Sequence, residues 1–157
     1  MKLLLLDSMY PSVSVRLVAD SAWRPDRRPL FVPEGAAGVS LELRTAVRIS
    51  RLGKCISPRW ASRYYDAVAL AAVRADIPGE YVMADDAVVL GPWQPLDGAA
   101  IDTAAFDATL AALSEGVTFK TGDVLLLPPV APAVTYTAPH TVAIGRDGHM
   151  ALTFNIR

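Results

Sequence analysis

The chain of 157 residues has ordinary globular composition, with 52% hydrophobic and 20% charged residues, and this length can bury a sizeable core. Its 15 basic and 16 acidic side chains give a net charge of -1, which gives no reason to expect nucleic acid or a membrane surface as a partner. The single cysteine, Cys55, excludes an intrachain disulfide and a cysteine-based metal site. The leucine run at 3–6 is too short for a signal peptide or a membrane span. We therefore expect one cytoplasmic domain over residues 1–157.

The first predicted elements are a short buried strand at residues 3–6 and a much longer strand at Val39–Ile49. Residues 7–33 between them are rich in proline, serine, aspartate and arginine, which favours loop structure with one possible strand at 30–32. In the long strand the odd positions are mainly apolar and the even ones mainly polar. Such alternation places the two sets on opposite faces, with Glu42 and Arg44 together on the polar one.

A helix is predicted next, because Ser57 can cap its N-terminus and Pro58 suits its first position. Propensity alone extends this helix through the alanines to Arg74. The remaining predicted elements are a strand at 88–90, a helix that Asp102 or Thr103 caps and that extends to about Ser114, and a buried strand at 123–127. A hairpin of residues 141–144 and 150–156, with a turn at Asp147-Gly148, ends the chain.

Seven segments, in one linear order, resemble the fumarylacetoacetate hydrolase family. The most informative are RISRLGK at 48–54 and ASRYYD at 61–66, which resemble the segment that follows the family's metal-binding strand. The other five are residues 19–22, 29–33, 89–93, 118–125 and 152–157. The resemblance implies an α+β, β-rich fold: a rolled mixed sheet with a few short helices, assembled as a homodimer. It also limits the helix to about 58–65 and implies a strand at 66–75.

The family binds magnesium or calcium through three carboxylates, two of them from an E-x-E pair on one face of a strand. The resemblance places Glu42 at the first of these positions, Arg44 at the second and Val73 at the third. One carboxylate of three remains. We therefore expect no metal and no other cofactor.

Other positions of the family's site have also changed. The segment that carries the family's histidine base corresponds to residues 9–13, which include Tyr10 but no histidine, and the lysine position falls near Val82. The lid is reduced to about residues 76–81. The substrate loop corresponds to residues 127–133, where three prolines remove backbone N–H donors.

These losses predict a protein that has lost metal-dependent catalysis and acts by binding or assembly. The alternative is a remodelled hydrolase, decarboxylase or isomerase for a small diketo or oxo acid. Such an enzyme would use a remnant pocket of Glu42, Arg44, Arg74 and Tyr10. For either function we expect a contact between Glu42 and Arg44, with Arg74 as a second possible partner of Glu42, because a buried carboxylate that has lost its cation needs another positive charge.

The other chemically tempting side chains have simpler interpretations. His140 and His149 flank the predicted hairpin without a neighbouring carboxylate–histidine pair, so we expect surface or core roles for both. Cys55 is expected to be a structural or incidental thiol. Asp85 and Asp86 are adjacent, and neighbouring side chains of an extended chain point apart, so a solvated turn is expected there.

Overall fold

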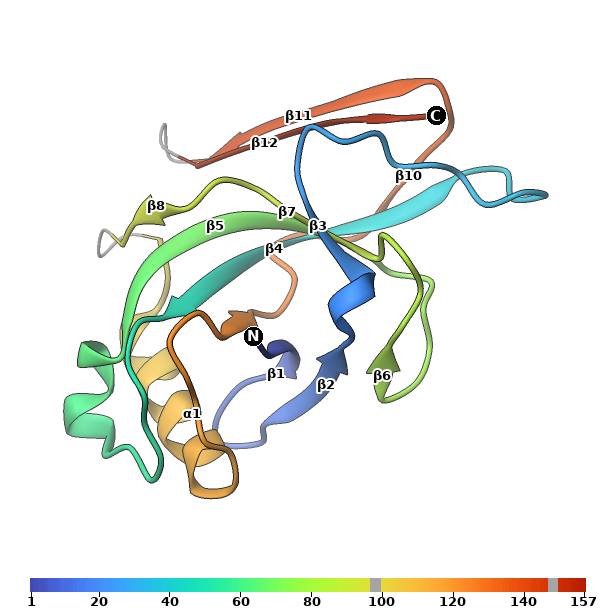
Figure 1. The fold of residues 1–157 in the computed structure, drawn as a ribbon. Helices are drawn as coiled ribbons and strands as arrows, with labels where there is room; N and C mark the ends of the chain where they lie inside the picture. Colours follow the sequence, from blue (N-terminus) through green and yellow to red (C-terminus); the bar gives the residue numbers. More distant parts are fainter. Residues whose placement is uncertain (97–99, 147–149) are drawn as a thin grey trace.

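The computed structural model describes residues 1–96, 100–146 and 150–157. Most of the chain forms a curled mixed β-sheet, with a separate hairpin packed against it and a few short helices (Figure 1). The ten strands described in the sheet are β1 (Leu3–Ser8), β2 (Ser14–Val18), β3 (Trp23–Pro25), β4 (Val39–Ile49), β5 (Tyr65–Arg74), β6 (Tyr81–Val82), β7 (Val88–Leu90), β8 (Gln94–Pro95), β9 (Val124–Leu126) and β10 (Val134–Tyr136). The hairpin consists of β11 (His140–Arg146) and β12 (Met150–Ile156). The expected β-rich fold is confirmed.

The sheet is built around β4 and β5, which pair antiparallel from Leu41 opposite Arg74 to Ile49 opposite Tyr65. The strand predicted at Val39–Ile49 is confirmed with the same bounds. The strand expected after the short helix is also confirmed, whereas a helix running to Arg74 would be wrong. Eight of the ten residues of β5 are buried, and most of them are alanine or valine. Small side chains allow close packing on both faces of a strand, and this tertiary environment overrides the helix propensity of alanine.

The two faces of the sheet contribute to two core clusters. One cluster joins β4 and β5 to the helix α1 (Thr103–Gly116) through Phe106 and Leu110, and to the hairpin through Phe154 and Leu152. The other is formed by alternate residues of the same strands, including Ala46 and Val73, together with residues of β1 and β9. The alternation along the strands thus separates two apolar regions, as a pleated sheet covered on both sides requires.

The helices begin close to where the sequence predicts. The carboxylate of Asp102 accepts a hydrogen bond from the backbone N–H of Ala105 at 3.1 Å and caps α1. The helix that starts at Pro58 is a short 3-10 helix, η2 (Pro58–Arg63), and Ser57 occupies its N-cap position without a side-chain capping bond. The expected capping role of the Ser57 hydroxyl is therefore wrong.

The segment at residues 7–33 contains more structure than its composition predicts: β2, the 3-10 helix η1 (Asp20–Ala22) and β3. The strand expected at 30–32 is reduced to an isolated bridge between Leu30 and Ile156. The hairpin is confirmed, while its turn at residues 147–148 and His149 lie outside the described residues. No helix in the described part of the chain is long and apolar enough to cross a membrane.

Candidate functional site

The three positions that correspond to the family's metal ligands lie on one face of the sheet. Glu42 on β4 is directly opposite Val73 on β5, so their side chains share a face. Arg44 follows Glu42 by two residues and lies on the same face. The pairing of β4 with β5 therefore brings together positions 42, 44 and 73, which correspond to the family's metal ligands.

Arg44 lies across the carboxyl ends of two parallel strands, β1 and β9. Its Nη1 donates to the carbonyl of Leu6 at 2.7 Å and to that of Leu127 at 3.2 Å. These carbonyls belong to the residues that directly follow the last paired residues of the two strands, Leu5 and Leu126. The guanidinium thus completes the hydrogen bonding of two buried backbone acceptors.

The remaining N–H groups of Arg44 bind carboxylates. Nε and Nη2 both donate to Oε2 of Glu42, at 3.0 and 2.8 Å, and Nη2 also donates to Oδ1 of Asp7 at 3.2 Å. The predicted contact between Glu42 and Arg44 is confirmed. A guanidinium has five N–H donors, and the five hydrogen bonds of Arg44 match that number. The residue is only 1% exposed.

Asp7 is a member of this cluster that the sequence did not indicate. It also accepts hydrogen bonds from Arg16, with Oδ2 2.7 Å from Nε and Oδ1 3.0 Å from Nη2. Burial raises the pKa of Asp7, but the hydrogen bonds and charges of Arg16 and then Arg44 outweigh it and hold the pKa below its usual value. The one sequence feature that could have pointed to Asp7 is its position directly after the predicted strand at residues 3–6. A polar side chain at the end of a strand often lies beside a neighbouring strand.

Arg74 does not belong to the cluster, so its expected pairing with Glu42 is wrong. It lies opposite Leu41 in the β4–β5 register, and its side chain therefore projects from the other face of the sheet. There it forms an ion pair with Asp76, with Nη2 2.7 Å from Oδ2. The pair holds the pKa of Asp76 below its usual value.

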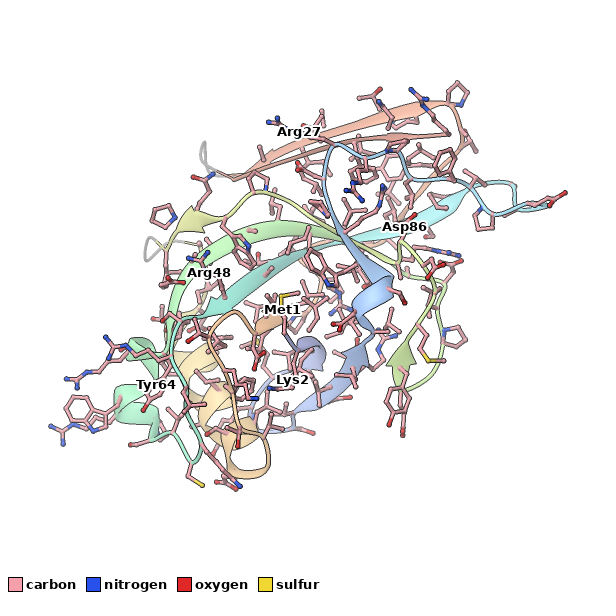
Figure 2. All side chains as sticks on the ribbon, in the orientation of Figure 1. Met1, Lys2, Arg27, Arg48, Tyr64 and Asp86 are labelled. Atoms are coloured by element: carbon pink, nitrogen blue, oxygen red, sulfur yellow. The ribbon has the colours of Figure 1, made fainter. Side chains whose placement is uncertain are left out.

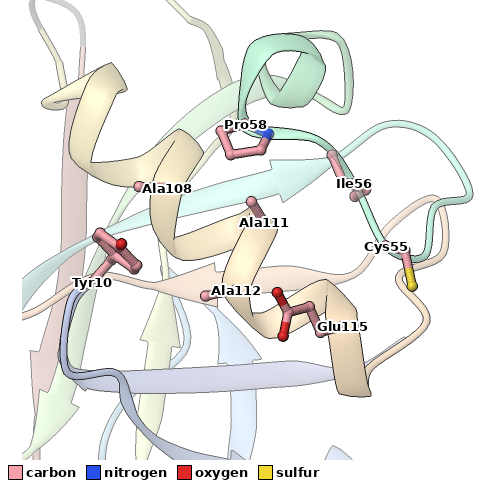
Figure 3. A pocket seen from close by; sticks show the side chains of 8 residues that line it. All are labelled: Tyr10, Cys55, Ile56, Pro58, Ala108, Ala111, Ala112 and Glu115. Atoms are coloured by element: carbon pink, nitrogen blue, oxygen red, sulfur yellow. The ribbon is translucent and has the colours of Figure 1, made fainter.

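Tyr10 lies in a different hollow, beside α1 (Figure 3). Its backbone N–H donates to Oγ1 of Thr109 at 3.0 Å, and the residue is 55% exposed. The hollow has a volume of 380 Å³ and is lined by Tyr10, Cys55, Ile56, Pro58, Ala108, Ala111, Ala112 and Glu115. The four residues proposed as one remnant pocket are therefore distributed over separate places, and only Glu42 and Arg44 are in contact.

A small cavity of 140 Å³ adjoins Glu42 and is almost entirely apolar. Its lining comes from β4, β5, β10, β11 and the loop that corresponds to the family's substrate loop: Leu41, Glu42, Leu43, Ala72, Ala131, Pro132, Val134, Tyr136, Val142 and Ile144. Glu42 is the only carboxylate in this lining among the residues that the structure describes. A charged diketo or oxo acid would lose its hydration here without gaining a cationic partner.

The residues at the ligand positions do not fit a divalent cation. Magnesium and calcium need several oxygen ligands, whereas the three ligand positions hold one carboxylate, a guanidinium and the valine side chain of Val73, and the nearby carboxylate of Asp7 is bound by Arg16 and Arg44. The guanidinium is positively charged and has no free lone pair with which to bind a metal ion. Among the residues that the structure describes, no group of three or more histidine, cysteine, aspartate or glutamate side chains is arranged to hold a metal ion.

The other tempting residues occupy ordinary positions. His140 is exposed and packs on Tyr136, with ring centroids 5.0 Å apart, and Cys55 is exposed. Asp86 does more than the predicted solvated turn requires, since its Oδ1 lies 3.3 Å from Nε of the buried Arg24. Burial lowers the pKa of Arg24 from its usual value.

Comparison with solved structures identifies the fold. The chain is similar to 5-carboxymethyl-2-hydroxymuconate delta-isomerase from Mycobacterium smegmatis, with 16% identity, a TM-score of 0.81, and coverage of 99% of this chain and 78% of that one. It is also similar to maleylpyruvate hydrolase from Sphingobium sp. SYK-6, with 14% identity, a TM-score of 0.79, and coverage of 99% and 70%. A protein from Yersinia pestis assigned to the fumarylacetoacetate hydrolase family matches with 15% identity, a TM-score of 0.80, and coverage of 99% and 92%.

No protein-family model matches the sequence, and no curated protein matches it. The solved structures nevertheless include hydrolases and isomerases that share one architecture with this chain. The chain has the fold of fumarylacetoacetate hydrolase-family proteins, as the seven sequence segments led us to expect.

Proposed function

We propose that this protein is a fumarylacetoacetate hydrolase-like chain that has lost metal-dependent catalysis and acts by binding or assembly. The observation that carries the proposal is the buried guanidinium of Arg44, whose donors are all used by Leu6, Leu127, Glu42 and Asp7. It supplies the positive charge that Glu42 requires, so no cation is needed for stability. No magnesium, calcium or other cofactor is part of the proposal.

A guanidinium can replace the structural role of a metal ion but not its chemistry. A bound metal activates a carbonyl because it has an open coordination position for the carbonyl oxygen. Arg44 would have to break one of its five hydrogen bonds to contact a substrate, and loss of either bond to the carbonyls of Leu6 and Leu127 would weaken the pairing of a buried acceptor. Tyr10 and Arg74 do not supply a replacement, because neither lies beside Glu42.

The proposal includes a cytoplasmic homodimer. Its support is the family resemblance together with exposed apolar side chains at the edge of the sheet: Val15, Leu17, Tyr81 and Met83 are 40%, 42%, 59% and 68% exposed. Leu17 on β2 pairs with Tyr81 on β6, Val15 lies on β2, and Met83 directly follows β6. Exposed apolar groups of this kind favour association.

A turnover assay with oxaloacetate as a probe oxo acid tests the loss of catalysis. The purified chain, supplied with magnesium or manganese, is expected to consume the probe no faster than a buffer containing the same metal. The Glu42→Gln variant serves as the matched control. Metal-dependent consumption by the unaltered chain that disappears in Glu42→Gln would contradict the proposal and favour a remodelled enzyme.

A further inference from the structure

The loop at residues 50–64, called the basic loop below, has a charge opposite to that of the rest of the chain. It carries Arg51, Lys54, Arg59 and Arg63 and no acidic residue. Because the chain has 15 basic and 16 acidic side chains, the remainder has 11 basic and 16 acidic ones, a net charge of -5. All four cationic side chains are exposed, and none of them forms an ion pair with a described residue.

The two ends of the basic loop are held together, so its four cations are carried by one compact segment. The backbone N–H of Ser50 donates to the carbonyl of Tyr64 at 2.8 Å, and Ile49 pairs with Tyr65 across β4 and β5. The loop, which contains η2, projects from the body of the molecule beside α1 (Figure 1). Compact loops with pinned ends are frequently functional.

An exposed tryptophan at the centre of the loop orders two of these cations. The guanidinium carbon of Arg63 lies 4.1 Å from the ring centroid of Trp60, and that of Arg59 lies 4.8 Å from it. Trp60 is 42% exposed, while the neighbouring Ala61 is completely buried and anchors η2. A guanidinium stacked on a ring keeps N–H donors free for a carboxylate, and its ordering reduces the entropy lost on binding.

We propose that the basic loop is a docking surface for a short acidic protein segment. Carboxylates match the guanidinium donors in geometry and charge. The proposal goes beyond the proposed function and does not rest on the loss of catalysis.

Two observations favour an acidic peptide over a nucleic acid or an anionic membrane. The Trp60 ring is already in contact with two guanidiniums, so a nucleotide base would have to displace one of them to stack there. An extended polyanion or a lipid surface would also reach beyond the loop, where the chain has a net charge of -5 and repels it. A short acidic segment can confine its contacts to the loop.

The test measures fluorescence anisotropy of a labelled peptide with eight glutamates separated by glycines, at low and physiological salt. Salt should weaken its binding, as expected for charge pairing between exposed groups. The double variant Arg59→Ser, Arg63→Ser should weaken binding at least tenfold. The matched control, Arg27→Ser with Arg28→Ser, loses the same charge and should stay within twofold of the unaltered chain. Figure 2 places Arg27 by the hairpin and Tyr64 at the base of the basic loop, on opposite sides of the molecule.

Two further measurements separate a specific surface from general attraction. Trp60→Ala should weaken binding, whereas Trp60→Phe should retain it because a phenyl ring also supports a guanidinium. In the unaltered chain, amide NMR signals that shift on peptide addition should belong to the basic loop. Shifts located elsewhere, or an equal loss in the Arg27 and Arg28 variant, would overturn the proposal. So would tighter binding of a single-stranded oligonucleotide or phosphatidylserine vesicles, or self-association without peptide that Arg59→Ser, Arg63→Ser abolishes.

Discussion

Removal of the Arg44 side chain should destabilise the fold far more than removal of a partly exposed arginine on the same strand. In Arg44→Ala the carbonyls of Leu6 and Leu127 each lose the hydrogen bond from Arg44, at a cost of about 1 kcal/mol each. The lost packing of the buried arm adds about 1 kcal/mol. Glu42 and Asp7 contribute less, because their side chains are 22% and 35% exposed and can recover water. The expected loss of unfolding free energy is about 3 kcal/mol.

The matched control is Arg48→Ala, which removes an exposed ion pair with Asp66 from the same strand. Such a pair contributes less than about 1 kcal/mol. Urea unfolding followed by tryptophan fluorescence measures both variants, and Arg44→Ala should also lower Tm by roughly 10 °C for a chain of this size. If the two variants differ by less than about 1 kcal/mol, Arg44 does not have the structural role assigned to it.

Three further predictions concern other parts of the fold. Asp123 is buried and accepts hydrogen bonds from both nitrogens of Lys2, at 2.7 and 2.6 Å, and from Lys120 N–H at 2.8 Å. Burial raises its pKa, but these bonds outweigh it and hold the pKa below its usual value. Its stabilising contribution is therefore complete above the unfolded pKa of about 4 and is lost as pH falls through the folded pKa. Asp123→Asn should lower the unfolding free energy at pH 7 by about 2 kcal/mol and flatten its acid dependence in urea titrations; an unchanged acid profile would contradict this. Asp102→Ala should cost about 1 kcal/mol through loss of the α1 cap, whereas a cost equal to that of Asp102→Asn would show that the cap is unimportant. Light scattering should give a dimer mass at micromolar concentration, and a monomer mass both there and in tenfold more concentrated samples would refute the homodimer.

The long strand β4 could be predicted because one of its faces is mainly apolar and the other mainly polar. The neighbouring strand β5 could not be predicted from periodicity, because both of its faces are buried and nearly every residue is apolar. Its alanines also favour a helix in isolation. The resemblance to a known family supplied the correct assignment, since it carries information about tertiary packing that propensity lacks.

The same distinction explains the candidate site. Glu42 and Arg44 are two residues apart on a regular strand, so their shared face follows from local geometry. The face of Arg74 depends on its register with β4, and a difference of one residue places it on the opposite side of the sheet. Asp7 is 37 residues from Arg44 in sequence, and its contact depends on the packing of β1 beside β9. Contacts of this kind are set by topology, and the position of Asp7 directly after the predicted strand at residues 3–6 does not identify its partner.

A calorimetric titration tests the central claim most directly: that Arg44 has replaced a metal ion. Magnesium, calcium and manganese chloride are titrated into the unaltered chain and into Arg44→Glu with Val73→Asp, which restores two carboxylates on the face of Glu42. A bound metal at 100 times its Kd would stabilise the native state by about 2.7 kcal/mol. We expect no saturable heat and no rise in Tm for the unaltered chain, and weak saturable binding for the double variant. A metal-dependent rise in Tm of the unaltered chain that Glu42→Ala abolishes would contradict the claim.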